Sequence, residues 1–138
     1  MSSYKILTKS GTDPELAPYL GTLYVDFIHT LRAGCDWFKA IDEDRYYKKY
    51  KAEIPKFLAR PEIVIRLACL TDDLDVCLGW SVSEGSKLHY VYVRKDQRRQ
   101  GIGTTLLPKE FNTITHLTHS GWFFRKKLFP NIIFDPFI

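Results

Sequence analysis

A strand, a basic loop containing glycine and the start of a helix follow one another between Lys87 and Leu107. The strand is predicted by the apolar, aromatic and β-branched run from Leu88 to Val93. Polar and mainly basic residues, Arg94 to Gln100, lead to Gly101-Ile102-Gly103, and Thr104 to Leu107 then opens a helical pattern. Glycines let main-chain N–H groups approach an anion closely, and the first N–H groups of a helix lack partners. This stretch therefore predicts a site for a phosphate or a pyrophosphate.

The loop does not fit two common phosphate-binding motifs. It lacks the Gly-Lys-Ser/Thr ending of a P-loop, and it has one glycine too few for a dinucleotide-binding fingerprint. The segment Arg98-Arg99-Gln100-Gly101-Ile102-Gly103 instead resembles the Arg/Gln-x-x-Gly-x-Gly/Ala acyl-CoA signature of the GCN5-related N-acetyltransferases. The segment from Cys77 to Val82, with Gly79 in its middle, is similar to the strand that precedes this signature in the family. The resemblance covers roughly residues 62 to 107.

The resemblance implies that acetyl-CoA donates an acetyl group to a primary amine of a small molecule or a protein. The main chain of Val91, Tyr92 and Val93 would bind the pantetheine arm, and one N–H there would polarise the thioester carbonyl. The pyrophosphate would lie on the loop and on the first hydroxyl after it: Arg98, Arg99, Gln100, Gly101, Ile102, Gly103 and Thr104.

Acetyl transfer to an alkylamine also needs a group that removes a proton, because an alkylammonium has a pKa near ~10. His89 is the first candidate, since some members of the family use a histidine or a carboxylate on this strand and imidazole titrates near pH ~6.5. Glu84 is the second candidate, and His116 and His119 could line the same cleft. A lone strand histidine can also be purely structural, so these alternatives stay open at the level of sequence.

Two departures from the family pattern concern the end of the chain. The family commonly has a tyrosine on its last helix that protonates the leaving thiolate, and the matching position here holds Phe124. Phenylalanine donates no proton, so Tyr92 or Tyr90 replaces it, water protonates the thiolate, or catalysis is weak. The family's closing strand pair is largely missing after Pro130, which could leave an edge that a second copy covers in a homodimer.

Two other functions are consistent with parts of this pattern. A regulatory protein that binds acyl-CoA without turnover would account for the missing tyrosine. A nucleic-acid-binding protein would use the basic residues Arg94, Lys95, Arg98, Arg99 and Arg125 to Lys127, with exposed aromatic residues between them. Tyr90 and Tyr92 lie on a predicted core strand instead, which disfavours nucleic acid as a partner.

Length and composition limit the class of protein. The 138 residues predict one domain over residues 1–138, and the net charge of +4, from 20 basic and 16 acidic residues, suits a polyanionic ligand. No apolar run approaches the ~20 residues of a membrane span, and no signal peptide is found. The cysteines Cys35, Cys69 and Cys77 form no C-x-x-C pair. We expect a cytoplasmic protein with reduced thiols, no metal and no membrane partner.

The order of helix and strand signals predicts an α/β (α+β layered) fold like that of the resembled family, with a mixed, mostly antiparallel central sheet, flanking helices and a shortened C-terminus. Its one parallel step is expected where the helix after the glycines connects two adjacent strands. Before the loop, strands are expected at Tyr4–Leu7, Ile63–Leu70 and Val76–Val82, and helices at Thr12–Gly34 and Asp42–Leu58. After it, strands are expected at 113–118 and 132–134 and a helix at 120–129.

Overall fold

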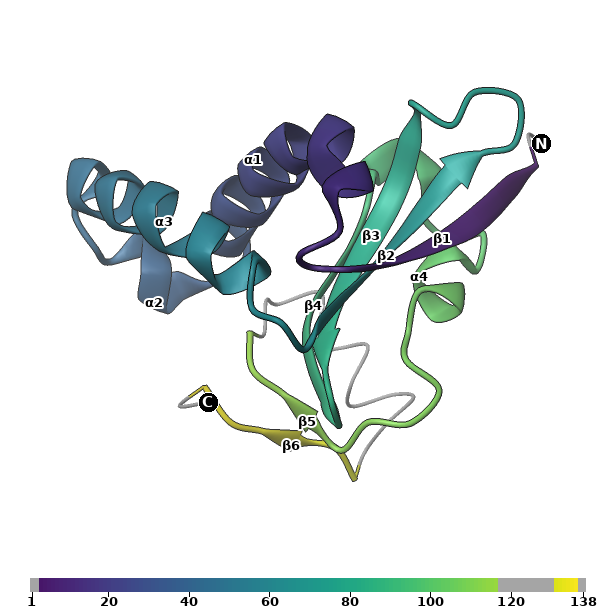
Figure 1. The fold of residues 1–138 in the computed structure, drawn as a ribbon. Helices are drawn as coiled ribbons and strands as arrows, with labels where there is room; N and C mark the ends of the chain where they lie inside the picture. Colours follow the sequence, from purple (N-terminus) through teal and green to yellow (C-terminus); the bar gives the residue numbers. More distant parts are fainter. Residues whose placement is uncertain (1–2, 117–130, 137–138) are drawn as a thin grey trace.

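A computed structural model describes residues 3–116 and 131–136 of the chain. Within these residues one six-stranded sheet follows the order of the sequence, and helices lie on both of its faces (Figure 1). The pairs β1–β2, β2–β3 and β3–β4 are antiparallel, whereas β4–β5 and β5–β6 are parallel. The strands are β1 Tyr4–Ser10, β2 Ile63–Leu70, β3 Cys77–Glu84, β4 Lys87–Val93, β5 Thr113–Ile114 and β6 Ile133–Phe134.

Capping side chains mark the start of the 3-10 turn that leads into the first helix and the start of the helix that begins at Glu43. The Asp13 side chain accepts a hydrogen bond from the Glu15 N–H at 2.9 Å, and Asp42 accepts one from the Arg45 N–H at 3.2 Å. The first three α-helices cover one face of the sheet, and the single turn α4 lies on the other face (Figure 1). Their bounds are α1 Ala17–Gly34, α2 Asp36–Lys39, α3 Glu43–Leu58 and α4 Ile102–Thr105, with 3-10 turns at Pro14–Leu16 and Lys95–Gln97.

Two apolar clusters hold β4 between the layers. On the face of α1 and α3, the Phe27 ring stacks on Tyr90 at 4.5 Å between ring centroids and lies 5.6 Å from Trp80. On the opposite face, Ile102 and Leu106 pack under the strands with Ala68 and Leu78. Because both faces of the central strands are covered, the backbone of β4 is fixed beside the loop that follows it.

The predicted fold class is confirmed, including the parallel step from β4 through α4 to β5. Several details differ, and one is the length of β5, which ends at Ile114 although residues 115 and 116 were expected in the strand. The helix after the glycines is one turn long, since Pro108 disfavours helical backbone at the residue before it. The sheet contains a second parallel pair, β5–β6, and α2 was not predicted because four residues are too few to show a period. The predicted helix at 120–129 and the end of the predicted strand at 117–118 lie outside the described residues.

Cys69 and Cys77 are partners in the register of β2 and β3, as neighbouring strands predicted, and both are free thiols. Burial raises the pKa of the Cys69 thiol, and it raises that of Cys77 to about 12. Little reactive thiolate therefore forms at neutral pH. Separately, none of the described helices combines the length and the apolar character that crossing a membrane requires.

Candidate active site

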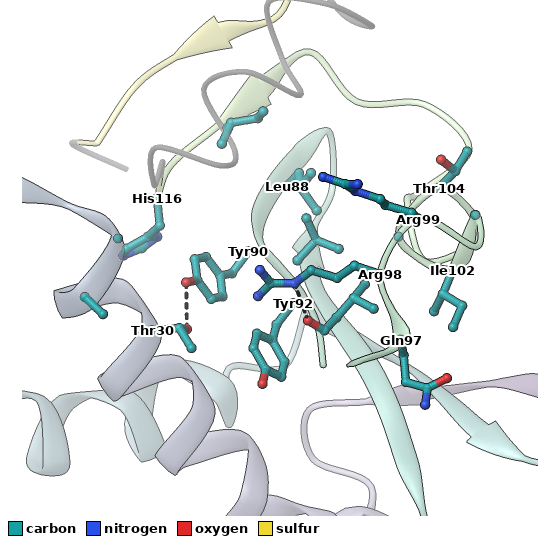
Figure 2. Close-up of a pocket in the computed structure, with 17 residues that line it drawn as sticks. Thr30, Leu88, Tyr90, Tyr92, Gln97, Arg98, Arg99, Ile102, Thr104 and His116 are labelled. Carbon is teal, nitrogen blue, oxygen red and sulfur yellow. Dashed lines mark hydrogen bonds between the residues drawn. The ribbon is translucent and has the colours of Figure 1, made fainter. Parts of the chain in front are cut away.

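A cavity of about 560 Å³ lies between β4, the C-terminal half of α1 and the loop Arg94–Gly103, which we call the glycine loop (Figure 2). Its walls combine apolar side chains with a few polar groups, which is typical of ligand sites. The lining residues that the sequence predicted for acyl-CoA are Val91, Tyr92, Val93, Arg98, Arg99, Gly101, Ile102, Gly103 and Thr104. Gln100 was also predicted and does not line the cavity.

Among residues 3–116 and 131–136, the edge of β4 that faces this cavity is paired only in part. β5 pairs with the first two residues of β4, Lys87 and Leu88, and β4 then continues to Val93. The N–H of Arg94 donates to the carbonyl oxygen of Leu78 on β3 at 2.9 Å. Peptide groups alternate in direction along a strand, so the N–H and C=O groups of Val91 and Val93 point away from β3, toward the cavity. The main-chain groups of Val91 and the N–H of Val93 can bind an extended ligand, while the groups of Tyr92 face β3 and the carbonyl oxygen of Val93 accepts a hydrogen bond from Arg98.

The glycine loop turns sharply beside this edge. Arg99 has a φ of 66° and Gly101 a φ of 81°, both in the left-handed region that favours glycine. The Nε–H of Arg98 donates to the carbonyl oxygen of Val93 at 2.9 Å and ties the loop to the end of β4. Figure 2 shows the Arg98 side chain extending toward Tyr90 and Tyr92. The loop thus brings positive charge to the mouth of the cavity.

The helix start contributes less to anion binding than the sequence predicted. With a single turn, α4 aligns too few peptide dipoles for a large partial charge at its N-terminus. The attraction for an anion therefore rests on Arg98, Arg99 and the main-chain N–H groups of the loop.

Two tyrosines line the cavity on the face of α1. The hydroxyl of Tyr90 hydrogen bonds with the Thr30 hydroxyl at 2.8 Å, and burial raises the pKa of Tyr90 to about 12 (Figure 2). The Tyr92 ring packs 5.9 Å from Trp80, and burial raises the pKa of this tyrosine too. Both phenols are protonated at neutral pH, so either can donate a hydrogen bond or a proton.

His89 occupies a β-bulge. Val82 of β3 is the partner of Tyr90 and Ser83 is the partner of Leu88, so His89 is an additional residue on β4. Its side chain is fully buried and does not line the cavity. The imidazole Nδ1 lies 2.7 Å from the Thr115 hydroxyl, and Nε2 lies 2.9 Å from Glu84 Oε1.

Glu84 and His89 form a hydrogen-bonded pair beside this bulge. Burial raises the pKa of Glu84, but the hydrogen bond and charge of His89 and the guanidinium of Arg60, at 3.3 Å, outweigh it and hold that pKa below its usual value. Burial lowers the pKa of His89, and the contact with Glu84 offsets this only in part. At neutral pH the pair is therefore a carboxylate and a neutral imidazole.

The structure adds residues to the cavity that the sequence did not predict. Thr30, Ala33 and Gly34 of α1 line the cavity, and Thr115 contacts His89. Ala33 and Gly34 follow Thr30 by three and four residues, so the three lie on one face of α1, and this spacing is visible in the sequence. His116 lines the cavity, as considered above, whereas His119 and Phe124 lie outside the described residues.

The chain matches no family model and no curated protein sequence. Among solved structures it is similar to a "Putative acetyl transferase from Pyrococcus furiosus", with 15% identity, a TM-score of 0.56, and coverage of 75% of this chain and 69% of that one. It is also similar to a GCN5-related N-acetyltransferase from Rhodopseudomonas palustris, with 24% identity, a TM-score of 0.50 and coverage of 77% of this chain. This chain spans 62% of the Rhodopseudomonas protein. At such identities the likeness concerns the fold.

Proposed function

We propose that this chain, which has the fold of the GCN5-related N-acetyltransferases, binds acetyl-CoA in the described cavity and transfers its acetyl group to a primary amine. The observation that carries the proposal is the edge of β4 beside the glycine loop, which within the described residues pairs with β5 only at Lys87 and Leu88. The edge offers main-chain donors and acceptors to an amide-containing arm, and the loop offers N–H groups and two arginines to a pyrophosphate.

The main chain of β4 and the tyrosine side chains would have different roles in the reaction. The main chain of Val91 and Val93 would hold the pantetheine arm, and one N–H there would stabilise the negative charge that develops on the thioester oxygen. The amine nitrogen forms a bond to the carbonyl carbon, the carbon–sulfur bond breaks, and the amine loses a proton. Tyr92, or else Tyr90 or water, would protonate the leaving sulfur.

The competing functions are weighed on the same site. Tyr90 and Tyr92 pack against Phe27 and Trp80, so their faces are not offered to nucleic-acid bases. A protein that binds acyl-CoA without turnover differs from an enzyme only in its chemistry, so the test must include an amine.

The cytoplasmic location stays a prediction. The homodimer also stays a prediction. The edge that a second copy would cover is β6, the last strand in the sheet order, where the Ile133 side chain is 62% exposed.

Calorimetric titration with acetyl-CoA, followed by titration with duplex DNA of equal total charge, tests binding. We expect acetyl-CoA to bind at micromolar to sub-millimolar concentration and DNA to bind only weakly at physiological salt. Release of free CoA thiol in the presence of a panel of amines then tests turnover. Binding without thiol release for any amine would favour the regulatory protein, and stronger binding of DNA than of acetyl-CoA would contradict the proposal.

A further inference from the structure

Four side chains form a continuous hydrogen-bonded chain from the cavity to the surface. The cavity-lining His116 has its Nδ1 2.9 Å from the Thr115 hydroxyl, and the same hydroxyl lies 2.7 Å from Nδ1 of His89. Nε2 of His89 lies 2.9 Å from Glu84 Oε1, and the Glu84 side chain is 16% exposed. Thr115 and His89 are buried between these ends. We call His116, Thr115, His89 and Glu84 the polar chain.

The chemistry of the four groups fixes the direction of every hydrogen bond. An ionised carboxylate only accepts, so neutral His89 donates to Glu84 from Nε2 and its Nδ1 accepts. The Thr115 hydroxyl must then donate to His89, and its oxygen accepts from Nδ1–H of His116. This leaves the lone pair of His116 on Nε2, the ring nitrogen that Thr115 does not contact.

The end of the polar chain at His116 lies where an acceptor amine would enter. His116 lines the cavity together with Thr30 and Tyr90, on the side of α1 and away from the glycine loop (Figure 2). Its ring packs edge-on to Phe27 at 5.5 Å, and to Phe57 at 5.9 Å, which fixes the plane of the imidazole. A nucleophile approaching a thioester held on β4 would therefore pass this histidine.

We propose that the polar chain is a proton relay, with His116 as the general base and with Thr115, His89 and Glu84 as positioning residues that carry the proton outward. The inference rests on the proposed function. The acceptor ammonium gives its proton to Nε2 of His116, whose Nδ1 proton passes to the Thr115 oxygen. The Thr115 hydroxyl proton passes to Nδ1 of His89, and the Nε2 proton of His89 passes to the Glu84 carboxylate. One proton enters at the cavity and one arrives at Glu84, from which it reaches solvent.

Electrostatics explain why a relay suits this site better than one base. Burial, and next the charge of His89, lower the pKa of His116 to about 4, although a hydrogen bond with the His89 backbone raises it in part. A base this weak holds a proton only briefly, and Glu84, whose own pKa is lowered, releases the proton to solvent at the surface end. Arg60 and Lys87 also disfavour a positive charge on His89, whereas Glu84 favours it.

Two measurements test the relay. In wild-type protein, ¹⁵N NMR of the histidine rings should show the proton on Nδ1 of His116 and on Nε2 of His89, and Thr115→Val should shift both rings. For an alkylamine acceptor, kcat should fall about 10²-fold in His116→Ala and in Thr115→Val and should recover in Thr115→Ser. An arylamine, already neutral at neutral pH, should be acetylated at similar rates by all of these variants.

Matched controls separate the relay from folding. Thr113 also lies on β5, and its hydroxyl bonds to Asn112 rather than to the polar chain, so Thr113→Val should keep the wild-type kcat. His29 is exposed on α1, and His29→Ala should do the same. Acetyl-CoA affinity, measured by calorimetry, should stay within about twofold in every variant.

The outcomes distinguish the two proposals. A proton found on Nε2 of His116 or on Nδ1 of His89 would overturn the relay whether or not the protein is active. Wild-type kcat with the alkylamine in folded Thr115→Val would overturn it as well. Absence of acetyl transfer by the wild-type protein to any amine would instead overturn the proposed function, and with it any catalytic use of the polar chain.

Discussion

The glycine loop follows β4, the polar chain includes His89 of β4, and the two regions are built in opposite ways. The loop is largely exposed, and its expected ligand contacts come from consecutive residues and mainly from the backbone. The polar chain is mostly buried, and its contacts come from four side chains on three different segments. A backbone site tolerates many side chains but requires particular conformations, whereas a side-chain relay requires particular residues at each position.

The two regions also differ in the exposure of their charges. Arg98 and Arg99 are charged and lie near solvent, so salt should weaken the attraction of the loop for an anion. The polar chain holds one carboxylate against a neutral imidazole, with Arg60 beside it at the surface. Binding of acetyl-CoA should thus depend on salt, whereas the proton transfer step should depend on salt only weakly.

The largest effect is expected from Gly103→Val in the glycine loop. A Cβ at this position would lie 3.6 Å from Val93 Cγ2, an ordinary contact, so folding should survive. The side chain would occupy the space needed by a phosphate and would remove hydrogen bonds to a charged group, worth ~1.5–3 kcal/mol each. Calorimetry should find acetyl-CoA binding weakened about 10²-fold or more.

Gly21→Val is the matched control for this change, because Gly21 lies on the exposed side of α1 with no atom near an added Cβ. Its acetyl-CoA affinity should equal that of the wild type. Unchanged affinity in folded Gly103→Val would show that the ligand does not use this loop.

A smaller effect is expected from Gly79→Ala, where β3 supports the end of β4. An added Cβ would lie 2.6 Å from the carbonyl oxygen of Tyr92 and 3.2 Å from Val93 Cα, so the two strands must separate. We expect the free energy of unfolding, measured with urea, to fall by about 1–3 kcal/mol. Acetyl-CoA binding should weaken as well, because the same strand end holds the loop.

Stability is the readout that can contradict this account of Gly79. If Gly79→Ala unfolds at the wild-type urea concentration, the strands accommodate the methyl group and the glycine has another role. Gly21→Ala should leave acetyl-CoA affinity unchanged and should be neutral or stabilising, since alanine favours helix over glycine by ~1 kcal/mol.

The glycine loop could be predicted because its information is local. A run of strand residues, a basic turn and two glycines stand together in the sequence, and the cavity brings the same residues together. The sheet order could also be predicted, because each strand pairs with its neighbour in the sequence. The second parallel pair could not, since Ile133 and Phe134 carry no signal for the direction of pairing.

The sequence indicated Glu84, His89 and His116 as candidate bases, but neither Thr115 nor the hydrogen bonds that join the four could be predicted, because tertiary pairing creates them. Strict alternation along β4 would place His89 and Tyr90 on opposite faces of the sheet. The bulge instead turns both toward the helices, where His89 meets Phe57 at 4.7 Å and Tyr90 meets Phe27 at 4.5 Å. Thr115 reaches His89 only because its N–H donates to the carbonyl oxygen of Leu88, 3.2 Å away.

The smallest effect is expected in the dependence of stability on pH, which probes the burial of the polar chain. The pKa values of His89 and His116 are lowered in the folded protein, that of His116 from 6.5 to about 4. Below pH 6.5 the unfolded chain therefore binds protons that the folded chain does not. Stability from these groups is complete above pH 6.5 and is lost as pH falls toward about 4. The lowered pKa of Glu84 extends the loss below 4.5.

Replacing His116 by asparagine should remove part of this dependence. Urea unfolding of His116→Asn, followed from neutral pH down to about pH 4, should show a shallower decline than that of the wild type. We expect a difference on the order of 1 kcal/mol, because each unit of pKa shift corresponds to ~1.36 kcal/mol and solvent screens a partly exposed ring. Thr113→Val, which replaces no titratable group, should retain the wild-type slope. Equal slopes in the two variants would mean that the folded protein does not hold His116 neutral. The contrast between the exposed loop and the buried polar chain would then apply to the polar chain only as far as His89.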